Sequence, residues 1–395
     1  MPEPSSPTVS RTLVVTNDFP PRVGGIQTFL YEAVRRRPPG SVVVYTSRWR
    51  GSTAFDDAQD FRIVRDRRRV LLPTPAVARR AKSLLVEHGC TSVLFGAAAP
   101  LGLLGPGLRD NGATRLIALT HGHEAGWAGV PGGSALLRRI GDGVDVVTYL
   151  GEYTRNRIAP ALSPAAAARM RQLAPGVDEG AFAPTVGGSA VRAKYGLENR
   201  PVVVCVSRLM ARKGQDTLIR ALPAVRSRVP GAVLLIVGSG PYRSRLEHLA
   251  QACGMSAHVV FTGSVSMAQL PAHYAAGDVF AMPCRTRNRG LDVEGLGIVY
   301  LEAAATGLPV IAGDSGGAPD AVVDGVTGYV VAAGDDQPAA VADRLSELLL
   351  DPARSAAMAL AGRSWVEECW RWDTVGERLG ELLDSASDLG RLGKR

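Results

Sequence analysis

The stretch Val202-Val-Val-Cys-Val-Ser-Arg-Leu-Met-Ala-Arg-Lys-Gly214 joins a run of apolar residues to a basic loop, and a helix-like segment follows. A short Val-rich run is typical of a parallel strand that is buried on both faces. Similar runs recur along the whole chain. The predicted strands are Leu13–Thr16, Val42–Thr46, Val93–Phe95, Leu116–Leu119, Val144–Tyr149, Val202–Val206, Val233–Val237, Val259–Phe261, Val279–Met282 and Val310–Ala312.

Amphipathic segments of helical length separate these strands, and the alternation occurs twice. The predicted helices include Gln27–Arg37, Ala76–Glu87, Thr217–Arg228, Ser244–Ala252 and Gln337–Leu350. Two such series predict two Rossmann-like, doubly wound α/β domains, which suits a chain of 395 residues. Residues 181–190 are small and rich in Gly and Pro, so the boundary is predicted there, with domains at 11–185 and 186–371. Residues 1–10 are predicted to form a disordered tail.

The charge of the chain is unevenly placed. Residues 1–180 contain 23 Lys and Arg against 15 Asp and Glu, whereas residues 181–395 contain 22 of each. A basic half can face nucleic acid, an anionic lipid or an acidic substrate, or it can be a solvated surface. Only 6% of the residues are aromatic, and no basic groove studded with aromatic side chains is evident, so no nucleic-acid partner is expected.

Cysteine usage and hydropathy predict a cytoplasmic protein. The five cysteines are dispersed and form no CxxC motif, which indicates reduced thiols. The first ten residues lack the charged start and the apolar core of a signal peptide. No apolar run reaches the ~18 residues of a membrane span, so any membrane contact is expected to be peripheral.

Two acids eight positions apart, Glu294 and Glu302, enclose the segment Glu294-Gly-Leu-Gly-Ile-Val-Tyr-Leu-Glu302. If a helix begins near Leu296, Glu302 lies about 9 Å along it at ~1.5 Å per residue. The two carboxylates can accept hydrogen bonds from hydroxyl groups, and the N–H groups of the helix start can face an anion. This arrangement suits a nucleotide sugar, in which a diphosphate lies between a sugar and a ribose.

Basic and glycine-rich loops follow other strands. Arg208 and Lys213 lie in a loop that enters a helix, where two cations suit a diphosphate. Gly24 and Gly25 precede the first helix and allow a ligand to approach the backbone closely. Each of these features taken alone also fits an ordinary turn or a solvated pair. Beside the two glutamates, they indicate a donor site for a nucleotide sugar.

The segment Thr120-His121-Gly-His123-Glu124 follows the strand at 116–119. Two histidines and an acid suggest a metal site, but the histidines are close together, and neither an HExxH motif nor a third ligand is evident. A polar histidine at the end of a strand is the favoured interpretation, and a structural histidine is the alternative. No metal is expected.

These motifs together resemble the retaining glycosyltransferases of family 4, which have the GT-B fold. The acidic E-x7-E motif is matched by Glu294 and Glu302, the basic pair by Arg208 and Lys213, and the glycine loop by Gly24 and Gly25. The resemblance runs from about residue 11 to residue 384. It implies two Rossmann-like domains that face a cleft, and a C-terminal helix at about 372–386 that crosses back to the first domain.

Longer segments are similar to one branch of that family, the actinobacterial GDP-mannose-dependent phosphatidylinositol monomannoside mannosyltransferases. The similar segments are Thr120–Trp127, Arg212–Asp216, Arg285–Glu302 and Ala312–Pro319. The resemblance implies a GDP-mannose donor, a phosphatidylinositol monomannoside acceptor, a retaining reaction and no cofactor or metal. It also implies that the enzyme binds peripherally to the cytoplasmic face of the plasma membrane, at the inner leaflet.

The resemblance also assigns roles to individual residues. It implies that Glu294 holds sugar hydroxyls, Glu302 holds the ribose, Arg208 and Lys213 neutralise the diphosphate, and His121 lies near the reacting sugar. The remaining donor-site residues that it implies are Gly24, Gly25, Gly263, Val265, Gly295, Leu296, Gly297 and Ile298.

Six basic residues are predicted to meet the acceptor lipid and the membrane. They are Arg67, Arg68, Arg69, Arg79, Arg80 and Lys82, and they lie near the apolar residues Val70, Leu71 and Leu72. Basic side chains are attracted to anionic bilayers by ~1 kcal/mol each. A solvated basic edge of the sheet is the alternative.

Two other functions remain open from the sequence. One is a family 4 transferase that uses a UDP-sugar or a soluble acceptor. The other is a non-catalytic protein that binds nucleotide sugars on the same fold. Release of GDP from GDP-mannose would separate the second from an enzyme.

Overall fold

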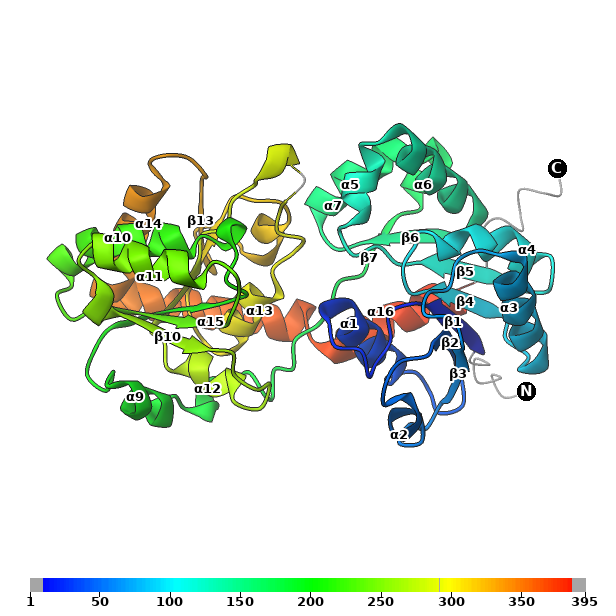
Figure 1. Ribbon diagram of the computed structural model, residues 1–395, viewed down its shortest axis with the longest axis horizontal. Helices are drawn as coiled ribbons and strands as arrows, with labels where there is room; N and C mark the ends of the chain where they lie inside the picture. The colour runs from blue at the N-terminus through cyan, green and yellow to red at the C-terminus, as the bar shows by residue number, and fades with distance from the viewer. Residues whose placement is uncertain (1–9, 291, 386–395) are drawn as a thin grey trace, which may run out of the picture. The chain divides into compact units, whose positions relative to one another are not determined.

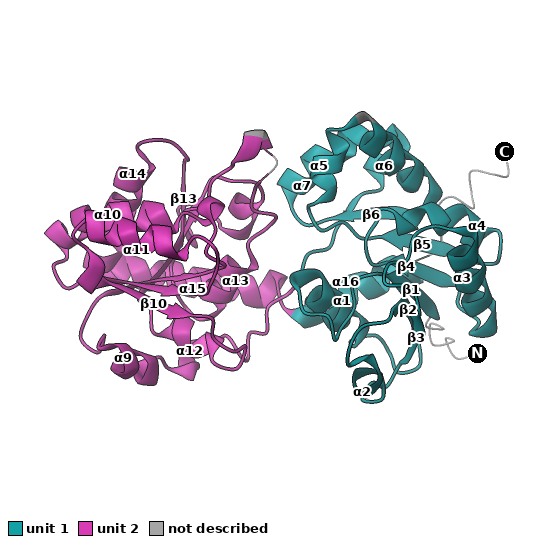
Figure 2. Ribbon diagram, viewed as in Figure 1, with its two compact units in different colours: residues 1–175, 372–395 teal, residues 176–371 magenta. Residues whose placement is uncertain are grey.

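The computed structural model describes residues 10–290 and 292–385. The chain forms two compact units, residues 1–175 with 372–395 (unit 1) and residues 176–371 (unit 2) (Figure 2). The boundary lies at 175/176, whereas the sequence placed it at 185/186. The intervening segment packs in unit 2, because Val177 N–H donates to Trp370 O and the Arg363 guanidinium donates to Phe182 O. Residues 1–9 of the predicted tail lie outside the described residues.

Unit 1 contains a parallel sheet of seven strands in the order β3-β2-β1-β4-β5-β6-β7 (Figure 1). The strands are β1 Thr12–Thr16, β2 Val42–Ser47, β3 Arg62–Asp66, β4 Ser92–Phe95, β5 Arg115–Ala118, β6 Val146–Tyr149 and β7 Arg171–Gln172. The helices are α1 Gly25–Val34, α2 Ser52–Asp56, α3 Pro75–Glu87, α4 Gly105–Arg109, α5 Glu124–Ala128, α6 Pro131–Gly143, α7 Glu152–Ile158, α8 Pro164–Ala168 and α16 Trp372–Asp384.

Both faces of this sheet are buried, which explains the continuous apolar runs of its central strands. Leu13 and Val15 of β1 join a core cluster with α3 and α6, while Val14 joins a second cluster with α1 and α16. Alternate residues of a strand point to opposite faces, so each strand contributes to both clusters.

Unit 2 contains a parallel sheet of six strands in the order β10-β9-β8-β11-β12-β13 (Figure 1). The strands are β8 Val202–Val206, β9 Val233–Val237, β10 Val259–Gly263, β11 Val279–Met282, β12 Val310–Gly313 and β13 Gly328–Val331. The helices are α9 Ser189–Tyr195, α10 Gln215–Arg228, α11 Arg243–Ala252, α12 Leu270–Ala275, α13 Ile298–Ala305, α14 Gln337–Leu350 and α15 Pro352–Cys369.

The C-terminal helix α16 belongs to unit 1, although it follows the last helix of unit 2 in the chain. Arg115 Nε donates to Leu382 O at 2.7 Å, and Ser92 Oγ donates to Leu383 O at 3.0 Å. Ser10, which the sequence placed in the tail, donates from Oγ to Asp384 Oδ1 at 2.6 Å. The first of the described residues is therefore joined to the end of α16 within unit 1.

Three strands were missed in the sequence, and all three lie at the edges of the two sheets: β3, β7 and β13. β3 contains Arg62, Arg65 and Asp66, and β7 has only two residues. Edge strands often bear charges, so β3 lacks the apolar run on which the prediction depended, and β7 is too short to show one. β13 is apolar, but it has only four residues and begins with a glycine.

None of the helices in the described part of the chain combines the length and the apolar composition that crossing a bilayer requires.

Candidate active site

The strand order of unit 2 places its basic and acidic loops side by side. β8 and β11 are neighbours in the sheet, and the order of the strands reverses between them. The basic loop 207–214 follows β8, and the acidic segment that ends at Glu294 follows β11. Ligands of open α/β sheets bind at the carboxyl edge of such a switch point.

Lys213 and Glu294 form a buried ion pair at this edge. Lys213 Nζ donates to Glu294 Oε2 at 2.6 Å, and the two residues are 9% and 8% exposed. Lys213 closes a short 3-10 turn, η4 Ala211–Lys213, and Gly214 follows at φ 76°. A side chain at Gly214 would lie 2.0 Å from Pro283 O, so only glycine lets the basic loop pack against the end of β11.

Arg208, the second predicted cation, differs from Lys213 in its exposure and its pairing. Its side chain is exposed, and within residues 10–290 and 292–385 it forms no ion pair. Its carbonyl accepts a hydrogen bond from Gln215 Nε2 at 3.0 Å, and the same amide donates to Ser207 Oγ at 2.8 Å. The backbone of the loop is therefore fixed while its guanidinium remains available to an anion.

Two glycine loops pack directly on these segments. The carbonyl of Ser207 would lie 2.0 Å from a side chain at Gly238, and the carbonyl of Leu209 would lie 2.3 Å from one at Gly240. The Val237-Gly-Ser-Gly-Pro241 loop thus supports the backbone of the basic loop.

The loop after β12 supports the acidic segment in the same way. Gly317 N–H donates to Glu294 O at 2.8 Å. Side chains at Gly316 and Gly317 would meet the carbonyls of Glu294 and Gly295 at 2.1 and 2.2 Å. These glycines therefore allow a close approach between the two backbones.

Two arginines to which sequence reasoning assigned no role, Arg212 and Arg285, tie the basic and acidic segments together. Arg212 Nε donates to Val293 O at 3.3 Å and lies 3.4 Å from Asp292 Oδ1. Arg285 pairs with Asp216 at 2.6 Å, and its N–H donates to Arg212 O at 2.8 Å. Both arginines lie in the motifs that carried the family resemblance, but spacing alone could not reveal contacts between residues 69 to 81 positions apart.

The helix that carries Glu302 begins later than the sequence indicated. α13 begins at Ile298, not near Leu296, and Gly297 caps it at φ 81°. Glu302 therefore lies about 6 Å along the helix at ~1.5 Å per residue, not 9 Å. The first N–H groups of α13, which a helix leaves without intrahelical partners, lie next to Gly295 and the buried Leu296.

Glu302 itself is held by a buried tyrosine. The hydroxyl of Tyr274 donates to Glu302 Oε2 at 2.6 Å, and Tyr274 is fully buried. Burial raises the pKa of Glu302 to about 7, although the tyrosine hydrogen bond acts in the opposite direction. A carboxyl of this kind changes its charge state near neutral pH.

Gly263 and Val265 lie at the end of β10, which is on the β8 side of the switch point. Gly263 is the last residue of the strand at φ 75°, and its carbonyl accepts from Gly238 N–H at 2.9 Å. Val265 is half-buried two residues later. The contact joins this loop to the Val237–Pro241 loop, and therefore to the carboxyl edge that carries Arg208.

In unit 1, the glycine loop begins the first helix. Gly24 caps α1, and a side chain there would meet Gln27 Oε1 at 2.2 Å. Gln27 donates to Asp18 Oδ1 at 2.7 Å, which fixes the loop. Space is open around Gly25, because no heavy atom lies within 4 Å of a side chain built there.

His121 follows β5 and is fixed at both its backbone and its ring. His121 Nε2 lies 2.6 Å from Gly96 O, and His121 N–H donates to the buried carboxylate of Glu124 at 2.9 Å. The ring of Phe29 packs edge-on at 5.7 Å. A carbonyl can only accept, so Nε2 carries the proton and Nδ1 presents a lone pair. Burial lowers the pKa of His121, which favours the neutral ring.

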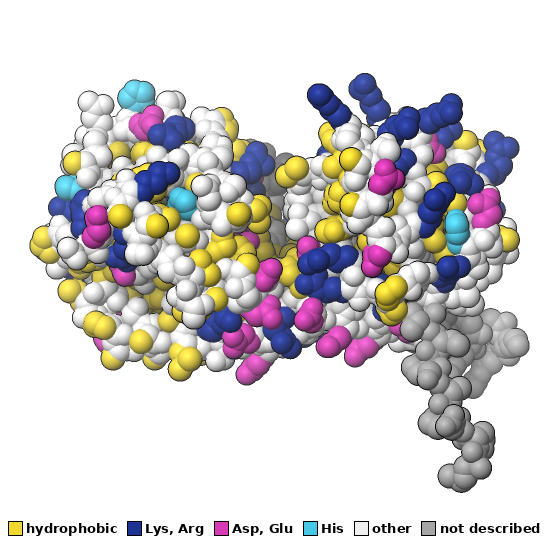
Figure 3. All heavy atoms as spheres, turned by 90° about the horizontal axis from the view of Figure 1, so that it is seen from below, with side chains coloured by type: hydrophobic (Ala, Val, Ile, Leu, Met, Phe, Trp, Pro, Cys, Tyr) yellow, Lys and Arg dark blue, Asp and Glu magenta, His cyan; other side chains and the backbone are white. Residues whose placement is uncertain are grey.

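The six basic residues predicted to meet the acceptor differ in whether an acidic side chain pairs with them. Arg68 pairs with Asp66 at 3.0 Å, and Arg80 lies 3.4 Å from Glu87. Arg67, Arg69, Arg79 and Lys82 form no ion pair within the described residues, and all but the half-buried Lys82 are exposed. Figure 3 shows Lys and Arg side chains gathered along one edge of unit 1.

The described part of the chain contains no group of three His, Cys, Asp or Glu side chains that could hold a metal ion. His123 Nε2 lies 3.3 Å from Glu124 Oε1, and the rings of His123 and His121 stack at 6.3 Å. The two histidines and Glu124 thus form a hydrogen-bonded and stacked group.

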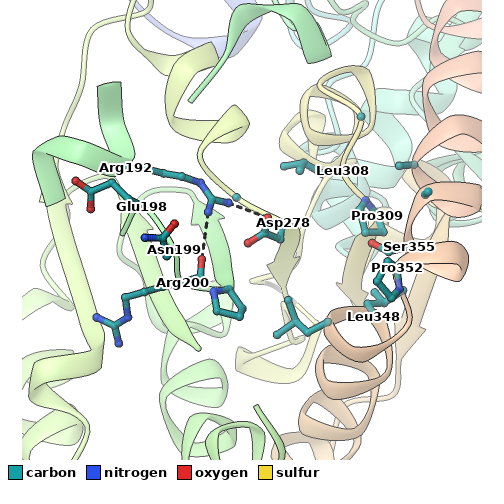
Figure 4. A pocket seen from close by; sticks show the side chains of 16 residues that line it. Arg192, Glu198, Asn199, Arg200, Asp278, Leu308, Pro309, Leu348, Pro352 and Ser355 are labelled. Carbon is teal, nitrogen blue, oxygen red and sulfur yellow. Dashed lines mark hydrogen bonds and ion pairs between the residues drawn. The ribbon is translucent and has the colours of Figure 1, made fainter. Parts of the chain in front are cut away.

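Unit 2 also has a hollow of about 580 Å³ at the opposite edge of its sheet (Figure 4). It lies beside the residues that begin the strands, such as Pro201, Asp278 and Pro309. Arg192 spans it, because its guanidinium donates to Asp278 Oδ1 at 2.7 Å and to Arg200 O at 3.1 Å. This hollow is separate from the carboxyl edge that carries the acids and cations.

Comparisons with known proteins agree with the geometry. The family model for glycosyl transferases group 1 matches residues 189–365, which lie within unit 2. In Anabaena, the crystal structure of Alr3699/HepE in complex with UDP has the same fold, with a TM-score of 0.77 and 20% identity over 94% of this chain and 99% of that one.

Two curated relatives are much more similar in sequence. One is the GDP-mannose-dependent alpha-(1-6)-phosphatidylinositol monomannoside mannosyltransferase of Mycobacterium tuberculosis, 53% identical over 95% of this chain and 98% of the relative. The other is a GDP-mannose-dependent monoacylated alpha-(1-6)-phosphatidylinositol monomannoside mannosyltransferase of Corynebacterium glutamicum, 47% identical over 95% and 98%.

Two Rossmann-like units with paired acids and cations at a switch point define a glycosyltransferase of the GT-B fold, as the sequence predicted. More narrowly, the chain belongs to the family of GDP-mannose-dependent phosphatidylinositol monomannoside mannosyltransferases.

Proposed function

We propose that this protein transfers mannose from GDP-mannose to a phosphatidylinositol monomannoside, with retention of configuration and without a metal ion. The observation that carries the proposal is the Lys213–Glu294 ion pair at the β8/β11 switch point. A carboxylate that could accept from sugar hydroxyls lies there beside a cation that could meet phosphate, which supports the proposal in a chain of this family.

The diphosphate of the donor would lie against Arg208, Lys213 and the start of α13. Departure of GDP builds negative charge on the phosphates, and fixed cations and N–H groups stabilise such charge without reorganisation. Lys213 is held by Glu294, and the arginines of the basic and acidic segments brace the loops that bear both groups. Preorganisation of this kind supports a reaction that needs no divalent cation.

The ribose and the sugar would be held by the two acids. Glu294 Oε2 accepts from Lys213, and Glu302 Oε2 accepts from Tyr274. The second oxygen of each carboxylate has no hydrogen-bond partner among the described residues and can accept from a ligand hydroxyl. We assign Glu294 to the mannose and Glu302 to the ribose.

The chemical step is proposed to be front-face attack. The bond between mannose C1 and the phosphate oxygen breaks, and GDP leaves with the electron pair. The acceptor hydroxyl forms the new bond to C1 on the same face, and its proton passes to the leaving phosphate. We assign the Nδ1 lone pair of His121 to a hydroxyl of the reacting mannose, because Nε2 is occupied by Gly96 O.

The acceptor is an anionic lipid, so the unpaired basic residues of unit 1 are assigned to its phosphate and to the bilayer surface. We propose peripheral binding at the cytoplasmic leaflet through Arg67, Arg69, Arg79 and Lys82. Arg68 and Arg80 contribute less, because Asp66 and Glu87 already offset their charge.

The test is a donor panel with purified full-length protein. GDP-mannose, UDP-glucose and UDP-N-acetylglucosamine are each supplied with phosphatidylinositol monomannoside, and products are identified by mass and by the anomeric NMR signal. The expected result is an α-mannoside from GDP-mannose alone, unchanged by EDTA. Transfer from a UDP-sugar, or hydrolysis without transfer, would reject the assignment of donor or acceptor, and a β-linked product would reject retention.

A further inference from the structure

Unit 1 has a small hollow between the start of α3 and the segment 103–108. It encloses about 300 Å³ and is lined by Pro73, Thr74, Pro75, Ala78, Lys82, Leu103, Leu104, Gly107 and Leu108. This volume lies at the lower end of the ~300–1,000 Å³ range of ligand pockets. The lining is apolar except for Thr74 and Lys82, so the pocket fits a hydrocarbon segment that ends in a negative charge.

The charges around the pocket are asymmetric. Pro75, Ala78 and Lys82 lie on one face of α3 at helical spacing, and Arg79 lies beside them. Neither Lys82 nor Arg79 forms an ion pair within residues 10–290 and 292–385. On another face of the same helix, Arg80 contacts Glu87 and Ser83. Thus the cations next to the pocket are the unneutralised cations of this helix.

One end of the pocket, at Pro73 and Thr74, lies near the carboxyl edge of the sheet, which is the edge that bears His121. Leu71, two residues before the lining begins, exchanges two hydrogen bonds with the side chain of Asn17, directly after β1. On the other side, residues 96–100 lead from the end of β4 into η1 Leu101–Leu104, and Gly96 O holds His121. Leu72 and Val70, which are 51% and 55% exposed, come just before Pro73, the first lining residue of the pocket.

We propose that this pocket receives part of an acyl chain of the phosphatidylinositol monomannoside acceptor, with the lipid phosphate held by Lys82 and Arg79. The inference rests on the proposed function and adds to it a direct contact with the acyl chain. The pocket then selects an acylated acceptor over its deacylated form, independently of any bilayer.

The experiment compares two water-soluble acceptors, the dihexanoyl lipid below its micellar concentration and the deacylated glycerophospho form. Both retain the phosphate and the sugar, so a difference in KM reports the acyl chain alone. Burial of only two methylenes corresponds to about a tenfold preference for the dihexanoyl acceptor. Leu103→Trp fills the pocket, and Ala78→Leu fills it with a smaller side chain in case the first variant folds poorly.

Val86→Trp is the matched control, because Val86 lies on the same helix, is 66% exposed and does not line the pocket. The expected result is that the pocket variants lose the preference through KM, while the control retains it. Equal use of the two acceptors by the wild type, or an undiminished preference in both pocket variants, would overturn this inference alone. Failure to transfer mannose to either acceptor would overturn the proposed function and this inference together.

Discussion

The two units present opposite kinds of site at the carboxyl edges of their sheets. In unit 2 most of the site groups are paired before any ligand binds, as in Lys213 with Glu294 and Tyr274 with Glu302, and Arg208 is the exposed exception. In unit 1 the central group is one neutral histidine, and the charges are unpaired arginines and a lysine in the loop 67–69 and on α3. A diphosphate needs preorganised charge, whereas a lipid headgroup at a membrane can be met by solvated cations.

The same contrast appears in the comparisons. The family model matches residues 189–365, so it covers a part of unit 2 and none of the described site residues of unit 1. The family model thus describes the unit with the paired charges, whereas the two mannosyltransferase relatives match 95% of the chain and therefore parts of both units.

The largest effect is expected from the two cations of unit 2. Arg208→Ala and Lys213→Ala should each lower kcat by on the order of 10²–10³, because each removes a positive charge from the leaving diphosphate. They should differ in stability. Arg208 is exposed and its loss should change the free energy of unfolding by less than ~0.5 kcal/mol, whereas Lys213→Ala strands a buried Glu294 at a cost of about 3 kcal/mol.

Steady-state kinetics and urea unfolding measure both quantities. The double variant Lys213→Met, Glu294→Leu replaces the buried pair with apolar side chains and should regain stability but not turnover. Near-normal turnover in Arg208→Ala would show that the guanidinium does not contact the diphosphate.

A smaller loss of catalytic efficiency is expected at His121. His121→Gln should lower kcat/KM about tenfold, which is the worth of one neutral hydrogen bond to the sugar. The pKa of His121 is lowered from 6.5 in the folded protein, so the unfolded chain binds more protons as the pH falls below that value. Stability should therefore decrease as the pH falls below 6.5. When stability is measured by thermal unfolding, the Tm of His121→Gln should decrease less than that of the wild type over the same pH range.

Glu302 should make stability depend on pH in the direction opposite to that expected from His121. Its pKa is raised from 4.5 to about 7, so the folded state binds more protons between these values, and stability should fall as the pH rises from 4.5 to 7. An ionised carboxylate is the better hydrogen-bond acceptor for ribose hydroxyls. Affinity for GDP, measured by calorimetry, should weaken several-fold as the pH is lowered through 7. Glu302→Gln should remove this dependence, and an unchanged profile would show that another group titrates.

The sequence predicted the sheets more completely than it predicted the site. The bounds of β8, β9 and β11 are those predicted, because a central parallel strand is apolar along its whole length. The start of α13 was placed two residues early, since Gly-Leu-Gly contains no residue that marks which glycine caps the helix.

The site residues were found as motifs, but their contacts were not. The spacing of the motifs contains no information on the Lys213–Glu294 pair, which joins residues 81 positions apart. The ring of His121 is likewise fixed by the carbonyl of Gly96, and backbone carbonyls leave no trace in a sequence. Contacts of this kind depend on the order of strands in the sheet, which a single sequence does not specify.

The smallest effect is expected at the surface of unit 1 that is proposed to bind the membrane. Arg79→Ala should weaken binding to vesicles that contain anionic lipid by about fivefold, since one charge near the surface contributes ~1 kcal/mol. Arg80→Ala, one position along the same helix, is the matched variant. Its effect should be under twofold, because Glu87 lies 3.4 Å from the guanidinium and already offsets its charge. Co-sedimentation at two salt concentrations measures both, and the difference should shrink at high salt as screening grows. Equal losses in the two variants would mean that the ion pair opens at the bilayer, and the contrast between paired and unpaired cations would then not govern how unit 1 binds lipid.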